Sequence, residues 1–68
     1  MTIRVRINGR EEAIGAATVA ELLRARGIEG KRGVAVAVNG VVVPAGAWSD
    51  RTLGADDAVE IVRPFGGG

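Results

Sequence analysis

The sequence predicts a two-layer α+β domain, with one helix packed on a mixed sheet of about five strands. Five short segments have the alternating or β-branched composition of strands, and two Asn-Gly pairs mark tight turns between them. A single helical pattern separates the two predicted hairpins. A helix folded over a sheet built from two hairpins is a compact solution for a chain of 68 residues.

Residues 2–7 form the first predicted strand, because apolar and polar side chains alternate along them. The apolar side chains on one face are those of Ile3, Val5 and Ile7. The opposite face carries Arg4 and Arg6. We interpret this basic stripe as a solvated sheet face, and attraction of an acidic partner is the alternative.

Asn8-Gly9 favours a type I′ hairpin turn, since both residue types accept a positive φ. Residues 10–14 return as the second strand, and Ile14 is its clearest core residue. Glu11 and Glu12 lie on opposite faces of this strand, so they are poorly placed as an acid–base couple. We expect both to be solvated.

The segment after the first hairpin predicts a short helix with recognisable ends. Thr18 and Glu21 have the spacing of a capping box, in which Glu21 reaches back to the amide of the cap. Gly27 is the expected C-terminal cap, and Arg24 and Arg26 suit the negative end of the helix dipole. The apolar stripe of the helix consists of Val19, Leu22 and Leu23. So short a helix must be held by packing on the sheet.

Residues 34–38 and 41–43 form the second predicted hairpin, joined by Asn39-Gly40. The first of these strands is apolar on both faces, as expected for a strand deep in a sheet. Pro44 ends the second strand because proline cannot donate to a ladder. The glycine-bounded loop at residues 30–33 lacks the P-loop spacing, so we discount it as a phosphate cradle.

Residues 45–53 are predicted to be irregular, with Trp48 covering the end of the core and ligand stacking on its ring as the alternative. Asp56-Asp57 is expected to form a solvated turn. Residues 58–63 form the last strand. One face of this strand carries Val59 and Ile61, and the other carries Glu60 and Val62.

The predicted order is therefore hairpin, helix, hairpin and strand. Since crossovers are right-handed, the last strand can lie beside the first, in the middle of the sheet. This is the β-grasp arrangement of ubiquitin-like domains. We expect a β-grasp domain over residues 1–64 and a flexible C-terminal tail over residues 65–68, because glycine loses more backbone freedom on ordering than any other residue.

The composition removes most catalytic classes from consideration. The chain has no His, Cys or Tyr, so it lacks the usual nucleophile–base pairs and the preferred zinc ligands. A net charge of +1, with one Trp and one Phe, does not indicate a nucleic-acid binder. No apolar run reaches membrane-spanning length. We expect a cytoplasmic protein, monomeric when free, that has no catalytic residues and binds no metal, nucleic acid or membrane.

The glycine end is the remaining candidate for chemistry. Gly66, Gly67 and Gly68 offer a slender chain with a carboxylate at its tip, which can enter a narrow active site of a partner and be activated there. The alternative is a loose end without function.

The segments with the most specific pattern are Ala37–Pro44, Trp48, Leu53, Val59–Val62 and Gly66–Gly68. Together they resemble the sulfur carrier protein of thiamine biosynthesis, the ThiS family, and the resemblance covers essentially the whole chain. Two positions depart from the family. At the position of Ala45, directly after the proline, the family often has an Arg, and its absence removes a possible salt bridge to a partner. At the position of Asp56, the family often has Gly.

The resemblance implies a chemical role for the tail. A ubiquitin-activating-like adenylyltransferase, using ATP and Mg²⁺, would adenylate the carboxylate of Gly68. Sulfur from a persulfide donor would then convert it to a thiocarboxylate, and thiazole synthase would receive the sulfur. This chain would be a co-substrate without a cofactor of its own, and Gly66 and Gly67 would thread into the partner sites. The residues expected to contact partners are Val62, Arg63 and Phe65. For Phe65, packing on the edge of the domain in the free protein is the alternative.

Three other functions stay open on the sequence. A sulfur carrier of molybdopterin synthesis has the same fold and Gly-Gly end, although the segment from Asn39 to Trp48 favours the thiamine carrier. A ubiquitin-like modifier would join the activated glycine to a lysine of a target protein. A passive β-grasp binding module would carry an incidental tail.

Overall fold

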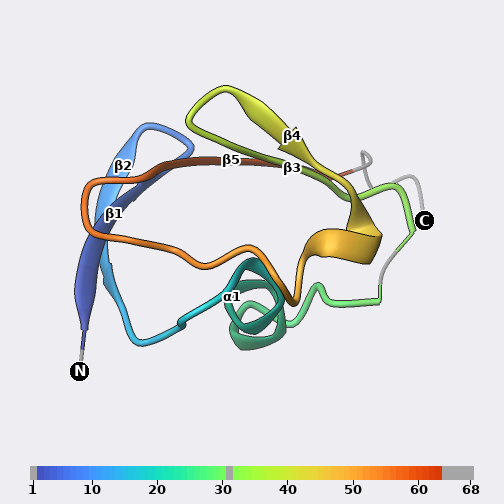
Figure 1. Cartoon of the computed structure of the whole chain (residues 1–68), viewed down its shortest axis with the longest axis horizontal. Helices are drawn as coiled ribbons and strands as arrows, with labels where there is room; N and C mark the ends of the chain where they lie inside the picture. Colours follow the sequence, from blue (N-terminus) through green and yellow to red (C-terminus); the bar gives the residue numbers. More distant parts are fainter. Residues whose placement is uncertain (1, 31, 64–68) are drawn as a thin grey trace.

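The computed structural model describes residues 2–30 and 32–63. Along these residues the chain forms a mixed sheet, one α-helix and one short 3₁₀ helix. The strands are β1 (Ile3–Ile7), β2 (Arg10–Ile14), β3 (Ala35–Val38), β4 (Val41–Val43) and β5 (Ala58–Val62). The helices are α1 (Val19–Ala25) and η1 (Ala45–Ala47). Figure 1 shows α1 beneath one face of the sheet.

The strand order in the sheet is β2-β1-β5-β3-β4. The two hairpins, β1–β2 and β3–β4, are antiparallel, and β5 lies between them. It pairs in parallel with β1 and antiparallel with β3. The last strand therefore lies beside the first in the middle of the sheet, and the predicted β-grasp arrangement is confirmed (Figure 1).

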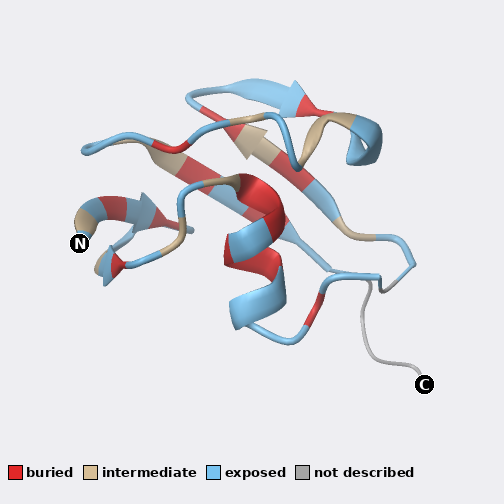
Figure 2. Cartoon of the chain, turned by 60° about the horizontal axis from the view of Figure 1, so that its bottom comes forward, coloured by how far each residue is buried: buried red, intermediate tan, exposed pale blue. Residues whose placement is uncertain are grey.

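The hydrophobic core lies between α1 and the sheet, and Figure 2 shows the buried side of the helix turned toward the strands. The predicted helical stripe is confirmed, since its three side chains are at most 2% exposed. The sheet contributes Val5, Ile7, Ile14, Val36, Val38, Val43, Val59 and Ile61. Burying one large aliphatic side chain fully is worth about 1.5–3 kcal/mol, so this set can hold a small domain together without disulfides.

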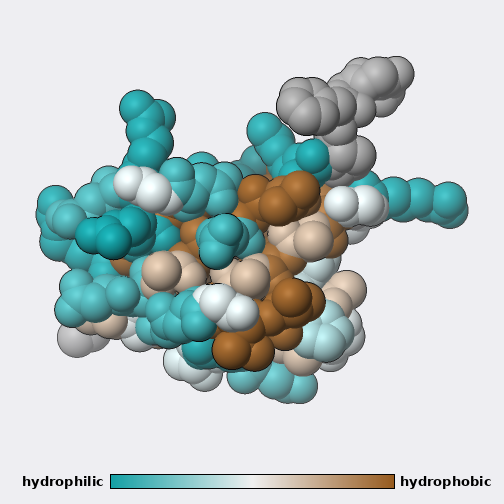
Figure 3. Space-filling model, turned by 90° about the horizontal axis from the view of Figure 1, so that it is seen from above, coloured by the Kyte–Doolittle hydropathy of each residue, from teal (hydrophilic) through white to brown (hydrophobic). Residues whose placement is uncertain are grey.

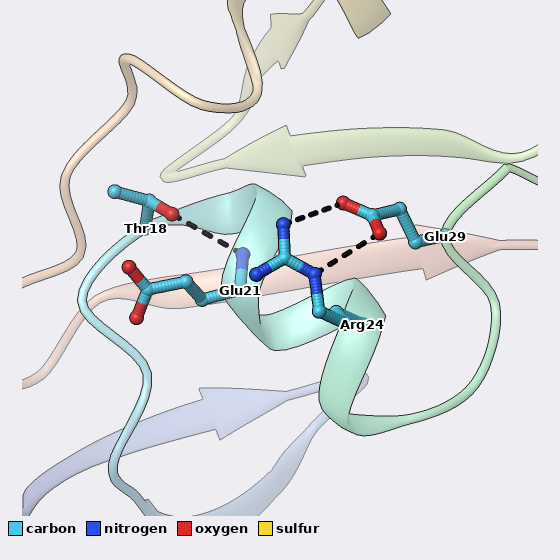
Figure 4. A network of polar contacts seen from close by, with 4 residues as sticks. All are labelled: Thr18, Glu21, Arg24 and Glu29. Carbon is cyan, nitrogen blue, oxygen red and sulfur yellow. Dashed lines mark hydrogen bonds and ion pairs between the residues drawn. The ribbon is translucent and has the colours of Figure 1, made fainter.

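The start of α1 has the predicted Thr cap with one difference. Thr18 Oγ1 accepts a hydrogen bond from the Glu21 amide at 3.2 Å (Figure 4). The Glu21 carboxylate, however, accepts from the amide of Ala17 at 3.0 Å, one residue before the predicted cap amide. Ala17 is in turn fixed by its carbonyl, which accepts from the Leu53 amide at 2.9 Å.

The end of α1 is a Schellman motif built on Gly27, which has a φ of +73°. Its amide donates to the Arg24 carbonyl, and the Ile28 amide donates to the Leu23 carbonyl, both at 3.0 Å. Just outside the helix, Glu29 accepts two hydrogen bonds of 3.1 Å from the Arg24 guanidinium (Figure 4). The hydrogen bonding and charge of Glu29 raise the pKa of Arg24 above its ordinary value.

Two predictions about the second half of the chain need correction. Residues 45–53 are not wholly irregular, because they contain η1. Trp48 follows η1 and packs against the core as predicted, and its Nε1 donates to the Val43 carbonyl at 2.8 Å. The strand β3 is buried on one face only: Ala35 is exposed, whereas Val36 is buried. Its second face is open because α1 covers one side of the sheet (Figure 1).

Candidate partner-binding site

The root of the predicted tail lies at the end of the central strand. Val62 is the last residue of β5 and is 62% exposed. Arg63 follows it, is exposed, and is the last residue that the structure describes. The other predicted site residues, Phe65, Gly66, Gly67 and Gly68, lie outside the described residues. Their roles therefore stay predictions.

Beside this root, the open face of the sheet carries an apolar surface. In the sheet register, Val62 stands opposite Ala35, and Ala37 stands opposite Val42, which is 70% exposed. We call these four residues the outer apolar patch. Figure 3 looks onto this side of the sheet and shows apolar surface gathered on its right half, over β3, β4 and the end of β5. Ala35, Val42 and Val62 are exposed and Ala37 is half-buried, and contiguous apolar surface of this kind is typical of an interaction surface.

The other half of the same side is polar (Figure 3). Arg4 and Arg6 are exposed there, as predicted, and Arg4 forms an ion pair with Glu11 at 3.0 Å. Glu12 instead pairs with Arg26, beyond the end of α1, so the two adjacent glutamates do lie on opposite sides of the sheet. The polar half bounds the outer apolar patch on the β1 side.

Both Asn-Gly turns reach across to β5 through their asparagine side chains. Asn8 Oδ1 accepts from the Ile61 amide at 2.8 Å, and Asn8 Nδ2 donates to the Ile61 carbonyl at 3.1 Å. At the start of the strand, Asn39 Oδ1 accepts from the Ala58 amide at 2.9 Å. The sequence indicates the turns but not this second role, because the role depends on which strand lies beside them.

A cleft of about 340 Å³ lies next to the strand end. It opens between the first hairpin turn, the end of α1 and the end of β5. The lining residues are Ile7, Asn8, Arg26, Ile28, Ile61 and Arg63. Sequence reasoning missed Ile28, which is 3% exposed. The apolar contact that accompanies a Schellman motif at this position is the signal that could have found it.

The acidic groups of the described residues are scattered over the surface. Among them, no three His, Cys, Asp or Glu side chains come together as a metal site. In this part of the chain, no helix has the length and apolar character that a membrane span requires. The geometry thus combines an apolar patch with the point where the chain leaves the sheet, which suits docking of a partner beside the tail.

Comparisons with known proteins agree with this architecture. The crystal structure of the thiamine biosynthesis protein ThiS from Geobacter metallireducens is 33% identical, with a TM-score of 0.78, covering 97% of this chain and 100% of that one. A solution structure of a thiamine biosynthesis protein from the same organism is 32% identical, with a TM-score of 0.79 and coverages of 97% and 88%. No curated protein sequence matches significantly. The ThiS family model matches residues 5–68, and the chain belongs to the ThiS family.

Proposed function

We propose that this protein is a sulfur carrier for thiamine biosynthesis, and that it carries sulfur as a thiocarboxylate on Gly68. The observation that carries the proposal is the ThiS family match, which runs over residues 5–68 and so includes the glycine end. Membership of this family makes the chain a small carrier protein and not a catalyst. The match also favours the thiamine carrier over the carrier of molybdopterin synthesis.

The proposed chemistry begins with activation of the carboxylate. A carboxylate is a poor electrophile until one of its oxygens becomes part of a good leaving group. The Gly68 carboxylate would attack the α-phosphorus of ATP on the partner adenylyltransferase, with pyrophosphate as the leaving group. Mg²⁺ would be held by that partner and the nucleotide. The product is an acyl-adenylate.

The next steps replace oxygen by sulfur. The terminal sulfur of a persulfide would attack the activated carbonyl and displace AMP, which gives an acyl disulfide. A thiol would then attack the sulfur that belongs to the donor, forming a disulfide with the donor and expelling the thiocarboxylate of Gly68. Thiazole synthase would take up this sulfur. Glycine suits the position because it leaves the carbonyl unhindered.

The domain body would supply recognition. The outer apolar patch lies beside the root of the tail, and exposed Val42 and Val62 give a partner apolar area to bury. Arg63 would contribute a charged contact at the border of this surface. We propose Phe65 as a further contact of the tail with its partners, and Gly66 and Gly67 as the part that enters their active sites.

The deciding experiment is intact-mass measurement after incubation with ATP, Mg²⁺, an adenylyltransferase partner and a persulfide source. We expect a mass gain that matches replacement of one oxygen by sulfur, located at Gly68 by fragmentation. A reaction without ATP is the control and should give no gain. An unchanged mass in the complete reaction, or isopeptide adducts as the main product, would contradict the carrier function.

A further inference from the structure

We propose that Asn8 is a positioning residue for the C-terminal tail. Its side chain makes two hydrogen bonds with the backbone of Ile61, and we call this pair of bonds the Asn8 clamp. The clamp holds the end of β5 in the sheet, so that the chain leaves the domain at a fixed point. This role rests on the proposed function, because it concerns presentation of the tail to an activating partner.

The clamp is needed because β1 is shorter than β5 in the direction of the tail. The parallel pairing of β1 with β5 consists of Arg6 with Ala58 and Ile7 with Val59. The Asn8 amide makes one further bond, to the Val59 carbonyl at 2.9 Å. The chain then turns away, with a φ of 50° at Asn8. At Ile61, two residues further along β5, the backbone of β1 has already left the ladder.

The Asn8 side chain takes the place of the missing strand at Ile61. An amide side chain carries one acceptor and a pair of N–H donors, so it can serve both groups of a peptide unit. Here Oδ1 accepts from the Ile61 amide at 2.8 Å and Nδ2 donates to the Ile61 carbonyl at 3.1 Å. Ile61 is 9% exposed, and an unpaired backbone group at so buried a position would be unfavourable. The side chain therefore extends the parallel ladder toward Arg63.

Loss of the clamp would leave the strand end held from one side. Across the sheet, β3 pairs with β5 up to Ala35 and Val62. Opening of Ile61 to Arg63 on the other side would make this strand end mobile and lower the fraction of molecules in which Arg63, at the root of the tail, is correctly placed. The proposed reacting carboxylate belongs to Gly68, seven residues beyond Ile61 in the sequence. The effect should therefore appear in binding to the partner and not in the chemical step.

The second hairpin turn provides a matched control. Asn39 has a φ of 52°, close to that of Asn8, and is also followed by glycine. Its Oδ1 likewise accepts from β5, but at Ala58, at the opposite end of the strand from the tail. Asn8→Gly and Asn39→Gly remove the two side chains without strain, since glycine accepts a positive φ. Asn8→Asp keeps the acceptor for the Ile61 amide and removes the donor for its carbonyl.

The test combines amide hydrogen exchange in the free proteins with steady-state kinetics of ATP-dependent pyrophosphate release by the adenylyltransferase partner. For Asn8→Gly we expect exchange of the Ile61 amide to accelerate about tenfold or more. We expect KM for this protein to rise about threefold to tenfold with kcat unchanged. Asn8→Asp should give an intermediate KM. Asn39→Gly should accelerate exchange at Ala58 and leave KM within about twofold of the wild type.

The outcomes separate the two proposals. Suppose that the wild type is active but that Asn8→Gly leaves KM unchanged, or that Asn39→Gly raises KM equally. Either result would overturn the positioning role and leave the proposed function standing. A fall in kcat at constant KM would also overturn the positioning role. A wild-type protein that supports no pyrophosphate release with its partner would overturn the proposed function, and the role of the clamp with it.

Discussion

Asn39 Nδ2 donates to Asp57 Oδ1 at 3.0 Å, which ties the second hairpin turn to the turn that precedes β5. The other oxygen of Asp57 accepts from the Gly54 amide at 2.8 Å. Asp57 is thus an anchor at the start of the central strand; it is half-exposed, so its interpretation as solvated surface holds in part, but the sequence does not predict its two hydrogen bonds. The interpretation is confirmed for its exposed neighbour Asp56.

The first prediction concerns the pH dependence of stability. Partial desolvation raises the pKa of Asp57, but the hydrogen bonds from Gly54 and Asn39 and the charge of Arg51 together hold it below its ordinary value. A carboxylate with a lowered folded-state pKa stabilises the fold above its unfolded pKa, and this stabilisation is lost as pH falls through the folded value. Asp57→Asn should lower the free energy of unfolding at pH 7 by about 1–2 kcal/mol. The difference should shrink on acidification below about pH 4.

Denaturant unfolding at a series of pH values measures this difference directly. Asp56→Asn is the matched control, because it makes the same change one residue earlier, at an exposed position with a φ of 69° that asparagine accepts. It should change stability by less than about 0.5 kcal/mol. Equal losses for the two variants, or a difference independent of pH, would contradict the anchoring role of Asp57.

The second prediction concerns the contribution to stability of the backbone conformation at Gly27, at the end of α1. A Cβ at Gly27 would meet nothing within 4 Å, so Gly27→Ala creates no clash; its cost comes from the φ of +73°. We expect a loss of about 1–2 kcal/mol in the free energy of unfolding, measured by thermal or denaturant unfolding. Gly46→Ala in η1 also meets no atom within 4 Å and lacks the positive φ, so it should be close to neutral or slightly stabilising. A neutral Gly27→Ala would refute the requirement for this cap.

The sequence predicts the fold well because its local signals agree with one another. Each Asn-Gly pair marks a hairpin, the Thr18 cap and Gly27 bound the helix, and alternation in β5 identifies Val59 and Ile61 as core residues. These features depend on neighbouring residues in the chain. The position of β5 beside β1, in the middle of the sheet, then follows from the right-handed crossover rule.

The features that the sequence does not predict depend on contacts between distant segments. The Asn8 clamp joins residues 53 positions apart, and it exists because β1 ends before β5 does. The open face of β3 has the same origin: its composition is apolar on both sides, and only the position of α1 decides which side is covered. Ile28 was missed because it lies in a loop without periodicity.

The third prediction tests the outer apolar patch in partner binding. Val62→Ser and Val42→Ser should weaken binding to the adenylyltransferase about threefold to tenfold, because each removes apolar area that a partner would bury. Val41→Ser is the matched control: Val41 is 67% exposed, but it stands opposite Val38, whose side chain faces the core. It should leave binding unchanged. Titration calorimetry measures the affinity of each variant, and thermal unfolding confirms that each variant is folded. Equal weakening of binding by Val41→Ser would argue against a specific patch.

The fourth prediction separates a carrier from a passive β-grasp binding module. Removal of Gly67 and Gly68 should leave the thermal unfolding midpoint within a few degrees of the intact protein, since the described core cluster lies between Val5 and Ile61. Sulfur transfer, followed by intact mass in the complete reaction, should be abolished, because the new terminal residue would be Gly66 and the carboxylate would sit two residues short of its place in the partner active site. Binding to the partner should persist, since the outer apolar patch is untouched. A truncated protein that still acquires sulfur would refute the assignment of Gly68, and one that unfolds would show that the tail supports the domain.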